Sequence, residues 1–267
     1  MPAETPSRTA TRTPTRDDVL AVIPARYAST RLPGKPLVVL AGKTMIERVW
    51  QRVSLAQSVT RVVVATDDER VLNAVRGFGG DAVMTRTTHR SGTERAAEVA
   101  AGPLGQNNIR FVVNVQGDEP LLDPAAIDAA VEAIDAEGEI GVATLAVPIA
   151  VTSEIMDPNV VKTVLDFEDR ALYFSRAPIP WVRDREGLVH ARHLKHLGLY
   201  AFRRDTLLEF PTLPTGVLER LEQLEQLRWL ENGYPIRVVE TMNDSVSVDV
   251  PEDVARVETL LRAAGEG

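Results

Sequence analysis

VLAVIPARYASTRLPGKP, residues 19–36, is the stretch of this chain that says most about its fold. Its first five residues form an uninterrupted apolar run, which is the pattern of a buried strand. Pro24 has no N–H group to donate to a sheet, so we expect the strand to end at Ile23. Pro33, Gly34 and Pro36 then constrain the backbone of the loop that follows. The sequence therefore predicts a core strand that leads into a constrained loop.

This loop gathers three cations, Arg26, Arg31 and Lys35, and two hydroxyls, Ser29 and Thr30. Arginine offers planar paired donors and lysine a point charge, and together they suit a polyphosphate. A solvated basic loop is the alternative interpretation. The loop lacks the G-x-x-x-x-G-K-[ST] spacing of a Walker A motif. No G-x-G-x-x-G follows any strand either, which disfavours a dinucleotide fold and an NAD-dependent oxidoreductase.

The composition is that of an ordinary globular protein, with 267 residues, 44% of them hydrophobic, and a net charge of −8. The negative charge argues against nucleic acid as a partner. No apolar run approaches the roughly 20 residues that a membrane span needs, so we expect no membrane partner. The absence of cysteine excludes disulfides and thiolate chemistry, and it is compatible with a reducing compartment.

Two parts of the chain differ in composition. Residues 1–17 are rich in Thr, Arg and Pro and lack the apolar stretch of a secretory signal, so we predict a disordered extension. Within residues 18–267 we find no linker composition, which favours a single domain. We expect that domain to have an embellished second half, around residues 150–235.

The first half of that domain alternates apolar strands with amphipathic helices, which predicts βαβ units, a mainly parallel sheet and an α/β fold. The strands are expected at 19–23, 61–65, 82–85 and 111–115, and the helices at 44–57, from 67 or 68 to 78, at 92–101 and from 123–124 onward. Thr44, with Glu47 three residues on, is a candidate capping box.

The second half is richer in strands and suggests an antiparallel extension of the same sheet. Strands are expected at 141–149, 160–166, 171–174, 193–202, 236–240 and 246–249, and helices at 217–231 and from 251 onward. In the helix 217–231 leucine recurs every third residue, so the apolar stripe winds around the helix. Such a helix packs against several neighbours, within one subunit or against a partner subunit.

A second polar segment, NVQGDEPL at residues 114–121, follows the core strand that ends near Val115. Ligands of open α/β sheets bind at the carboxyl ends of strands, so this segment and the Arg26 loop should face one crevice. Asp118 is suited to hold Mg²⁺, which prefers carboxylate and phosphate oxygens. A turn that starts a helix is the alternative interpretation of Gly-Asp-Glu-Pro.

These two segments together resemble the sugar-nucleotide cytidylyltransferases, and the resemblance extends in the family's order from Val19 to about Val257. It implies a three-layer αβα, Rossmann-like nucleotide-diphospho-sugar transferase fold with a mixed, mainly parallel sheet. It also implies transfer of CMP from CTP to 3-deoxy-D-manno-octulosonate (Kdo), with Mg²⁺ as cofactor and pyrophosphate as the other product. Another acidic sugar, such as a sialic acid or an amino derivative of Kdo, and a non-catalytic nucleotide-binding module are the alternatives.

The resemblance also implies which residues bind the nucleotide and the metal. Asp249, in VSVDVPEDV, would be the second metal carboxylate beside Asp118, although the family often has Gly-Val-Asp-Thr-Pro here. The turn MTRTTHRSGTER, residues 84–95, matches a turn that lines the base and ribose. The implied nucleotide-binding residues are Pro24, Ala25, Arg26, Ser29, Thr30, Arg31, Lys35, Thr85, Arg86, Ser91 and Gln116. The implied catalytic residues are Arg26, Lys35, Asp118 and Asp249.

The sugar would be bound by residues of the second half, in the segments YFSR, HLGLY and LEQLR. The implied set is Gln116, Arg176, His196, Tyr200, Glu225 and Gln226. An arginine suits a carboxylate, while Tyr, Glu and Gln suit sugar hydroxyls. Ordinary packing is the alternative for each residue taken singly. The resemblance further implies a cytoplasmic homodimer that acts in lipopolysaccharide biosynthesis.

Overall fold

The computed structural model describes residues 19–29, 31–105, 108–183 and 192–266. The extension predicted at residues 1–17 and the predicted nucleotide ligand Thr30 lie outside the described residues. Within the described ranges, no helix combines the length and apolar character that crossing a membrane requires.

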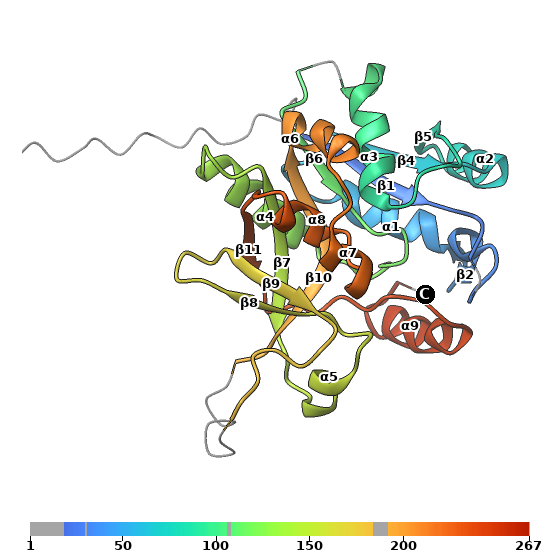
Figure 1. Ribbon diagram of the computed structural model, residues 1–267. Coiled ribbons are helices and arrows are strands. Elements are labelled where there is room, and N and C mark those ends of the chain that lie inside the picture. Colours follow the sequence, from blue (N-terminus) through green and yellow to red (C-terminus); the bar gives the residue numbers. More distant parts are fainter. Residues whose placement is uncertain (1–18, 30, 106–107, 184–191, 267) are drawn as a thin grey trace, which may run out of the picture.

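One nine-stranded sheet organises the molecule (Figure 1). Along its main path the order is β11 (Ile236–Glu240), β7 (Val142–Pro148), β10 (Leu194–Arg203), β6 (Phe111–Asn114), β1 (Val19–Ala25), β4 (Arg61–Thr66) and β5 (Asp81–Met84). Strand β1 runs parallel to both β4 and β6, whereas β10 is antiparallel to β6 and β7. Strands β8 (Lys162–Leu165) and β9 (Ala171–Ser175) form an antiparallel pair attached to β10. The mixed, mainly parallel sheet and its antiparallel extension are thus confirmed.

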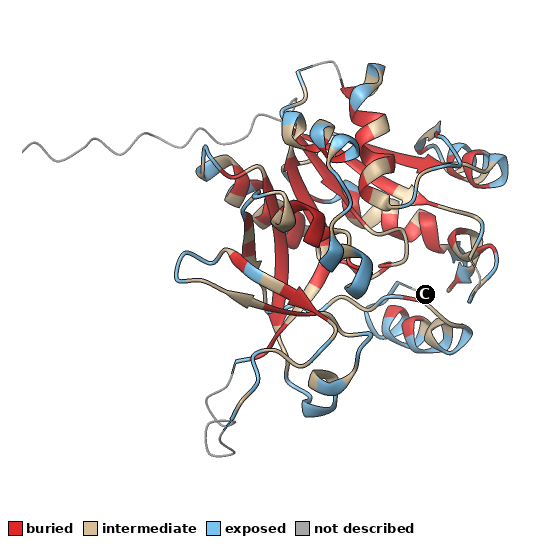
Figure 2. Cartoon of the chain, in the orientation of Figure 1, coloured by how far each residue is buried: buried red, intermediate tan, exposed pale blue. Residues whose placement is uncertain are grey.

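Helices cover both faces of this sheet. Ala21 and Ile23 of β1 pack into a core with α1 (Met45–Ser54), α4 (Pro124–Ala136) and α9 (Pro251–Ala263). Leu20 and Val22 pack on the opposite face with α3 (Gly92–Ala101), α6 (Arg204–Glu209) and α8 (Gln226–Glu231). The alternation follows from the two-residue period of a strand. Figure 2 shows the buried sheet between the helices, and the predicted three-layer fold is confirmed.

Strand β1 continues through Pro24 to Ala25, so the expected end at Ile23 is wrong. On the β6 side, the ladder reaches its last pair at Val22 and Asn114. Pro24, two residues further, faces the same side, where no strand of the described chain needs its missing N–H. It therefore remains in register with Ala65 of β4 without loss of a ladder bond.

The helix expected at 217–231 is two short helices, α7 (Val217–Glu222) and α8. Gln223 ends α7 in a left-handed conformation with φ 55°. Leu221 before the break is exposed, whereas Leu224 and Leu227 after it are buried. The leucine stripe therefore belongs to two helices with different environments and does not wind around one.

Other differences from expectation are local. Residues 246–249, all described, have no regular secondary structure, so the strand expected there is absent. The sequence also gave no indication of the small hairpin β2 (Val39–Leu40) and β3 (Lys43–Thr44), of the 3₁₀ turn η1 (Lys35–Leu37), or of helix α5 (Thr152–Met156). Helix α2 (Glu69–Gly77), by contrast, agrees with the expectation: it begins after Asp68, whose side chain caps it by accepting from the N–H of Arg70.

Candidate active site

A cleft of ≈ 400 Å³ opens at the carboxyl ends of β1 and β6. Its lining includes eight of the predicted site residues: Pro24, Ala25, Arg26, Ser29, Arg31, Lys35, Gln116 and Asp118. The first loop and the segment after β6 therefore share one crevice, as their positions at neighbouring parallel strand ends require.

In the wall of the cleft, the ammonium group of Lys35 is held between the carboxylate of Asp118, which also lines the cleft, and that of Asp249, which does not. Lys35 Nζ lies 2.5 Å from Asp118 Oδ2 and 2.9 Å from Asp249 Oδ1. A guanidinium nitrogen of Arg31 also lies 2.9 Å from Asp249 Oδ1. The side chain of Lys35 is only 14% exposed, so these contacts are partly shielded from water. Two carboxylates that are far apart in the sequence thus share one cation.

Close backbone approaches produce this geometry. A Cβ atom on Gly117 would lie 2.7 Å from the carbonyl oxygen of Pro24, so only glycine lets the segment before Asp118 pass the end of β1. The N–H of Val248 donates to the carbonyl of Asp118 at 2.9 Å, which brings the Asp249 segment alongside. The carboxylate of Asp253 accepts from the N–H of Asp249 and fixes the start of α9.

The environment of Lys35 favours its charged form. Burial alone would lower the pKa of the Lys35 ammonium, but the nearby carboxylates of Asp118 and Asp249 outweigh burial and raise it above its usual value. The group is therefore a fixed positive charge at neutral pH.

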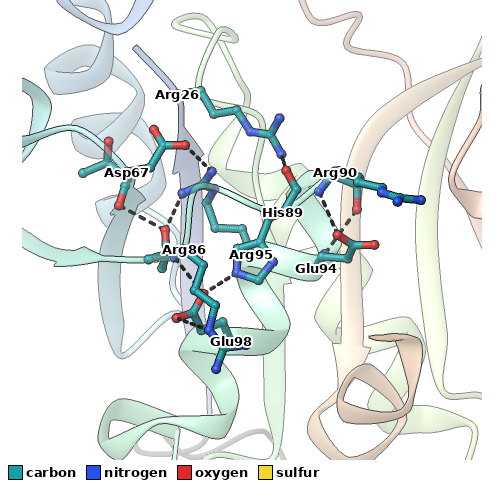
Figure 3. Close-up of polar contacts among 11 residues, drawn as sticks. Arg26, Asp67, Arg86, His89, Arg90, Glu94, Arg95 and Glu98 are labelled. Carbon is teal, nitrogen blue, oxygen red and sulfur yellow. Dashed lines mark hydrogen bonds and ion pairs between the residues drawn. The ribbon is translucent and has the colours of Figure 1, made fainter. Parts of the chain in front are cut away.

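Arg26 lies at the other side of the cleft, against the turn that precedes α3 (Figure 3). Its guanidinium donates to the carbonyl of His89, whose imidazole pairs with the carboxylate of Glu98. Burial, followed by repulsion from Arg95, lowers the pKa of Arg26, while Asp67 and the nearby glutamates oppose that shift. Contacts with α3 thus fix this turn, and the turn positions Arg26, a predicted phosphate ligand.

Three further predicted nucleotide ligands lie in or beside this turn but do not line the cleft. The Thr85 hydroxyl donates to the carbonyl of Thr66 at 3.0 Å. Ser91 caps α3 by accepting from the N–H of Glu94. The side chain of Arg86 is 77% exposed. Their contacts in this structure are internal or with solvent, and their roles toward a nucleotide stay predictions.

A buried polar cluster lies next to the cleft. Thr93 Oγ1 donates to Glu225 Oε1 at 2.9 Å and accepts from Asn114 Nδ2 at 3.4 Å. Tyr200 is opposite Asn114 in the sheet register. Gly92, in the cleft lining, packs against the side chain of Asn114 and joins the two regions.

Two oxygens of this polar cluster, Asn114 Oδ1 and Glu225 Oε2, are buried with no hydrogen-bond partner among the described residues. Such orphaned acceptors cost free energy unless a ligand or water satisfies them. Asn114 is not among the ligand-binding residues predicted above. A polar residue that ends an otherwise apolar strand, FVVN, was the available signal.

The titratable groups of this region favour neutral forms. Burial raises the pKa of Glu225, although hydrogen bonds from Ser91 and Thr93 oppose the shift. Burial, with a contribution from Glu225, raises the pKa of Tyr200 well above its usual value. Burial lowers the pKa of His196 to about 3. His196 Nε2 lies 2.9 Å from Thr144 Oγ1, and its ring packs against Phe174 and Tyr200.

The remaining predicted sugar ligands are placed differently. Gln116 lines the cleft and donates to the carbonyl of Gly198 at 3.1 Å, which ties the cleft to β10. Gln226 is buried in the first turn of α8. Arg176 does not line the cleft: its guanidinium donates to the carbonyls of Glu222 at 2.8 Å and Pro158 at 2.9 Å. Its role toward a carboxylate stays a prediction.

A mixed α/β sheet with a basic loop and convergent carboxylates at its strand ends is typical of nucleotide-dependent transferases. The model of a family described as Cytidylyltransferase matches residues 20–242. The chain therefore belongs to the cytidylyltransferase family, and it is a nucleotidyltransferase.

Relatives and solved structures agree with this assignment. The chain is 53% identical over 246 residues to the 3-deoxy-manno-octulosonate cytidylyltransferase of Solibacter usitatus, covering 92% of this chain and 95% of the relative. It is 48% identical over 253 residues to the enzyme of the same name from Geobacter sulfurreducens, covering 92% and 100%. A solved CMP:2-keto-3-deoxy-manno-octonic acid synthetase in complex with CTP superposes with a TM-score of 0.86 at 42% identity, covering 92% and 99%.

A more distant solved structure shares the fold alone. The 4-diphosphocytidyl-2C-methyl-D-erythritol synthase of Anaerococcus prevotii superposes with a TM-score of 0.61 at 11% identity, covering 92% of this chain and 97% of that one.

Proposed function

We propose that this protein transfers CMP from CTP to Kdo and releases pyrophosphate. The observation that carries the proposal is that Asp118 and Asp249 converge on Lys35, and that Lys35 and Asp118 line the same cleft as Arg26. The 42–53% identity to proteins named for this reaction, over about nine-tenths of the chain, supports CTP and Kdo as the substrates. The anomeric hydroxyl of the sugar attacks the α-phosphorus of CTP in line as pyrophosphate leaves.

Arg26 and Lys35 hold the β- and γ-phosphates and neutralise the leaving pyrophosphate. Arg31 and Ser29 lie on the same loop within the cleft and add donors along the triphosphate. Thr85, Arg86 and Ser91 support the base and ribose through the turn that Arg26 contacts. Catalysis then consists mainly of positioning and charge neutralisation, and no side chain is assigned as a general base.

Asp118 and Asp249 fit a divalent cation. Among the described residues there is no group of three or more His, Cys, Asp or Glu side chains that would form an all-protein metal site. The two carboxylates nevertheless point at one cation, the Lys35 ammonium, which stands where a metal would be held. Mg²⁺ commonly binds through one or two carboxylates plus substrate phosphates. When bound, it supplies charge neutralisation at the α-phosphate.

Lys35 consequently has two sets of anionic partners. Without nucleotide it neutralises Asp118 and Asp249, and a bound triphosphate offers it an alternative. Transfer of the ammonium to the phosphates frees the carboxylates for a cation. Nucleotide binding and metal binding should therefore favour each other.

The sugar is held by Gln116 and by groups of the polar cluster, with Tyr200, Glu225 and Gln226 facing its hydroxyls and His196 beside them. Asn114 supplies a further acceptor, since its Oδ1 is buried and unpartnered among the described residues. Arg176 reaches the sugar carboxylate only if its guanidinium leaves the carbonyls of Pro158 and Glu222.

Pyrophosphate release across a grid of four nucleoside triphosphates and several sugar acids tests the proposal directly. We expect turnover with CTP and Kdo to exceed every other combination. Equal turnover with a sialic acid, or with ATP in place of CTP, would contradict the substrate assignment. The matched control is the Asp118→Asn variant, which should be inactive with every pair.

We also propose that the protein is a cytoplasmic homodimer that supplies lipopolysaccharide synthesis. Large apolar side chains between residues 150 and 235 are exposed, which supports a partner surface there. They include Met156, Phe167, Leu172, Trp181 and Leu221. Light scattering during size-exclusion chromatography should give twice the mass of one chain, and a monomer at micromolar concentration would contradict the dimer.

A further inference from the structure

Arg48 of α1 is an almost completely buried arginine that lies outside the cleft, with a side chain only 3% exposed. Its Nε donates to the carbonyl of Leu40 at 2.6 Å, and one terminal nitrogen donates to the carbonyl of Ala41 at 2.6 Å. The same nitrogen donates to the carbonyl of Glu266 at 3.0 Å, and the other lies 3.6 Å from the Glu266 carboxylate. One guanidinium thus joins two segments that are far apart in the sequence.

The first segment is the hairpin that follows Lys35. Residues Lys35–Leu37 form η1, and the hairpin β2–β3 comes directly after it. At the hairpin tip Ala41 has φ 45°, a left-handed conformation that an alanine adopts only when its surroundings hold it. Arg48 provides that hold through the carbonyls of Leu40 and Ala41, so it constrains the path of the chain away from Lys35.

The second segment is α9, which begins two residues after Asp249. Only Val257 and Leu261 are buried in this helix, all of whose residues are described. Within the helix, Glu258 accepts from the N–H of Ala41 at 2.9 Å. Glu266 follows the end of the helix, where its N–H donates to the carbonyl of Leu261, and its carboxylate also lies 3.7 Å from Arg52. Figure 1 shows α9 lying beside β2. A 13-residue helix is stiff and about 20 Å long, so fastening its far end constrains Asp249 at the near end.

We propose that Arg48 is a positioning residue for the reaction: its guanidinium clamps the Lys35 loop and α9 to the same point and thereby sets the approach of Lys35 to Asp249. The inference rests on the proposed function for the role of Asp249. Lysine cannot replace this arginine, because a single ammonium lacks the fixed fork that spans both segments. Arg48 touches no substrate, and it acts only through the two elements that it joins.

The test compares Arg48→Lys and Glu266→Gln with Arg256→Gln, which removes an exposed arginine from the same helix. The first readout is hydrogen exchange of residues 251–263 and 38–44, measured by mass spectrometry on the whole protein without ligands. The second is Mn²⁺ affinity in the presence of CTP, followed by electron paramagnetic resonance. The third is the KM of each substrate against kcat.

We expect Arg48→Lys to speed exchange in both segments and to weaken Mn²⁺ binding about 10-fold, as loss of a supporting contact behind a metal ligand typically does. The KM for the sugar should stay within about twofold, because the sugar side of the cleft is untouched. Glu266→Gln should also speed exchange and weaken Mn²⁺ binding, but by less than Arg48→Lys. Arg256→Gln should match the parent protein in both measurements. Glu266→Gln also keeps the test decisive if Arg48→Lys does not fold.

Two results would overturn the positioning role. The first is faster exchange in α9 with unchanged Mn²⁺ affinity, which would make the clamp a matter of stability alone. The second is unchanged exchange in both segments. A parent protein that binds Mn²⁺ no better than Asp249→Asn would instead overturn the metal role of Asp249, and the exchange data, which need no metal, would still show whether Arg48 joins the two segments.

Discussion

The two sides of the site differ in their electrostatics: charged groups are paired around Lys35, whereas burial disfavours charge around Glu225. At the side of Lys35, charges face each other across short distances, and the pKa of Lys35 is raised so that the cation persists. In the polar cluster beside Glu225, burial shifts the pKa of Glu225 upward and that of His196 downward to about 3, so the neutral forms are favoured. On one side the charges are paired, and on the other burial shifts the pKa values of Glu225 and His196 toward their neutral forms.

This difference fits the parts that the two substrates would play. A triphosphate brings charge that fixed cations must neutralise, and paired charges cost less to bury than single ones. Apart from its single carboxylate, the sugar acid brings uncharged hydroxyls, and neutral partners recognise these without an unpaired ion in a buried place. The comparison predicts that charge-removing substitutions are severe on the Lys35 side and mild in the polar cluster.

The largest effect is expected for Asp118→Asn, which removes a charge without changing shape. We expect kcat to fall by about 10²–10³ or more, the usual scale for loss of a key electrostatic contact. Combining it with Asp249→Asn should add little, because both groups would serve one cation. Pyrophosphate release at saturating Mg²⁺ measures the effect. Asp205→Asn, an exposed carboxylate, is the control, and activity of Asp118→Asn within a few-fold of it would exclude the metal role.

Lys35→Met should distinguish the two proposed roles of the ammonium, which are to bind the triphosphate and to neutralise Asp118 and Asp249 when no nucleotide is bound. CTP binding should weaken roughly 10- to 150-fold, the value of a charge-assisted bond of about 1.5–3 kcal/mol. Mn²⁺ binding to the nucleotide-free protein should become tighter, because the competing cation is gone. Calorimetry measures both affinities, with Lys43→Met as the exposed control. Weaker Mn²⁺ binding in the variant would contradict the exchange of partners.

In the polar cluster, Glu225→Gln and Glu225→Ala should differ. Burial favours the neutral carboxyl, so the amide should change the KM for Kdo by no more than about threefold, whereas alanine should raise it about 10-fold by removing the hydrogen-bonding group. The KM for CTP should change less in both variants. Steady-state kinetics at pH 7 decides the point, and an amide as damaging as alanine would show that the ionised carboxylate is required.

The smallest expected effect is a pH dependence of stability from His196. The pKa of His196 is lowered in the folded protein. Its contribution to the free energy of unfolding is therefore complete at pH values above the unfolded-state pKa near 6.5, and it is lost as the pH falls toward 3. With allowance for partial exposure of the ring, we expect about 1 kcal/mol of loss by pH 5 relative to pH 7. Urea unfolding at both values measures it. A His196→Gln variant should lack this component, and equal losses in both proteins would contradict a neutral buried ring.

Much of the fold could be predicted because its determinants are local. Thr44 and Asp123 cap helices through N–H groups within three residues, as the sequence indicated. The apolar runs of β4 and β6 mark core strands for the same reason, since a run of β-branched residues favours a strand wherever it is buried. The two polar segments after β1 and β6 share a crevice because neighbouring parallel strands end at one edge.

Errors arose where tertiary contacts override local preference. A single helix across residues 217–231 would satisfy local helix propensity. In the structure the helix is interrupted at Gln223, with Leu221 exposed before the interruption and Leu224 buried after it. A proline usually ends a strand. At Pro24, however, the pairing of β1 with β6 has already ended at Val22, so no backbone hydrogen bond is lost and the strand continues. The role of Arg48 could not be predicted from the sequence, because its link to Glu266 joins residues that are 218 positions apart.

The sequence by itself thus determined the strands of the main sheet, several helix caps, the polar loops and the family to which the chain belongs. Only the tertiary structure decided that Lys35 meets Asp249 across 214 residues, that Arg48 bonds both Leu40 and Glu266, and that Asn114 and Glu225 keep buried oxygens without partners among the described residues. The physical reason is range. Backbone preferences and capping act over a few residues, whereas pairing, burial and the resulting pKa shifts depend on which distant segments the sheet order brings into contact.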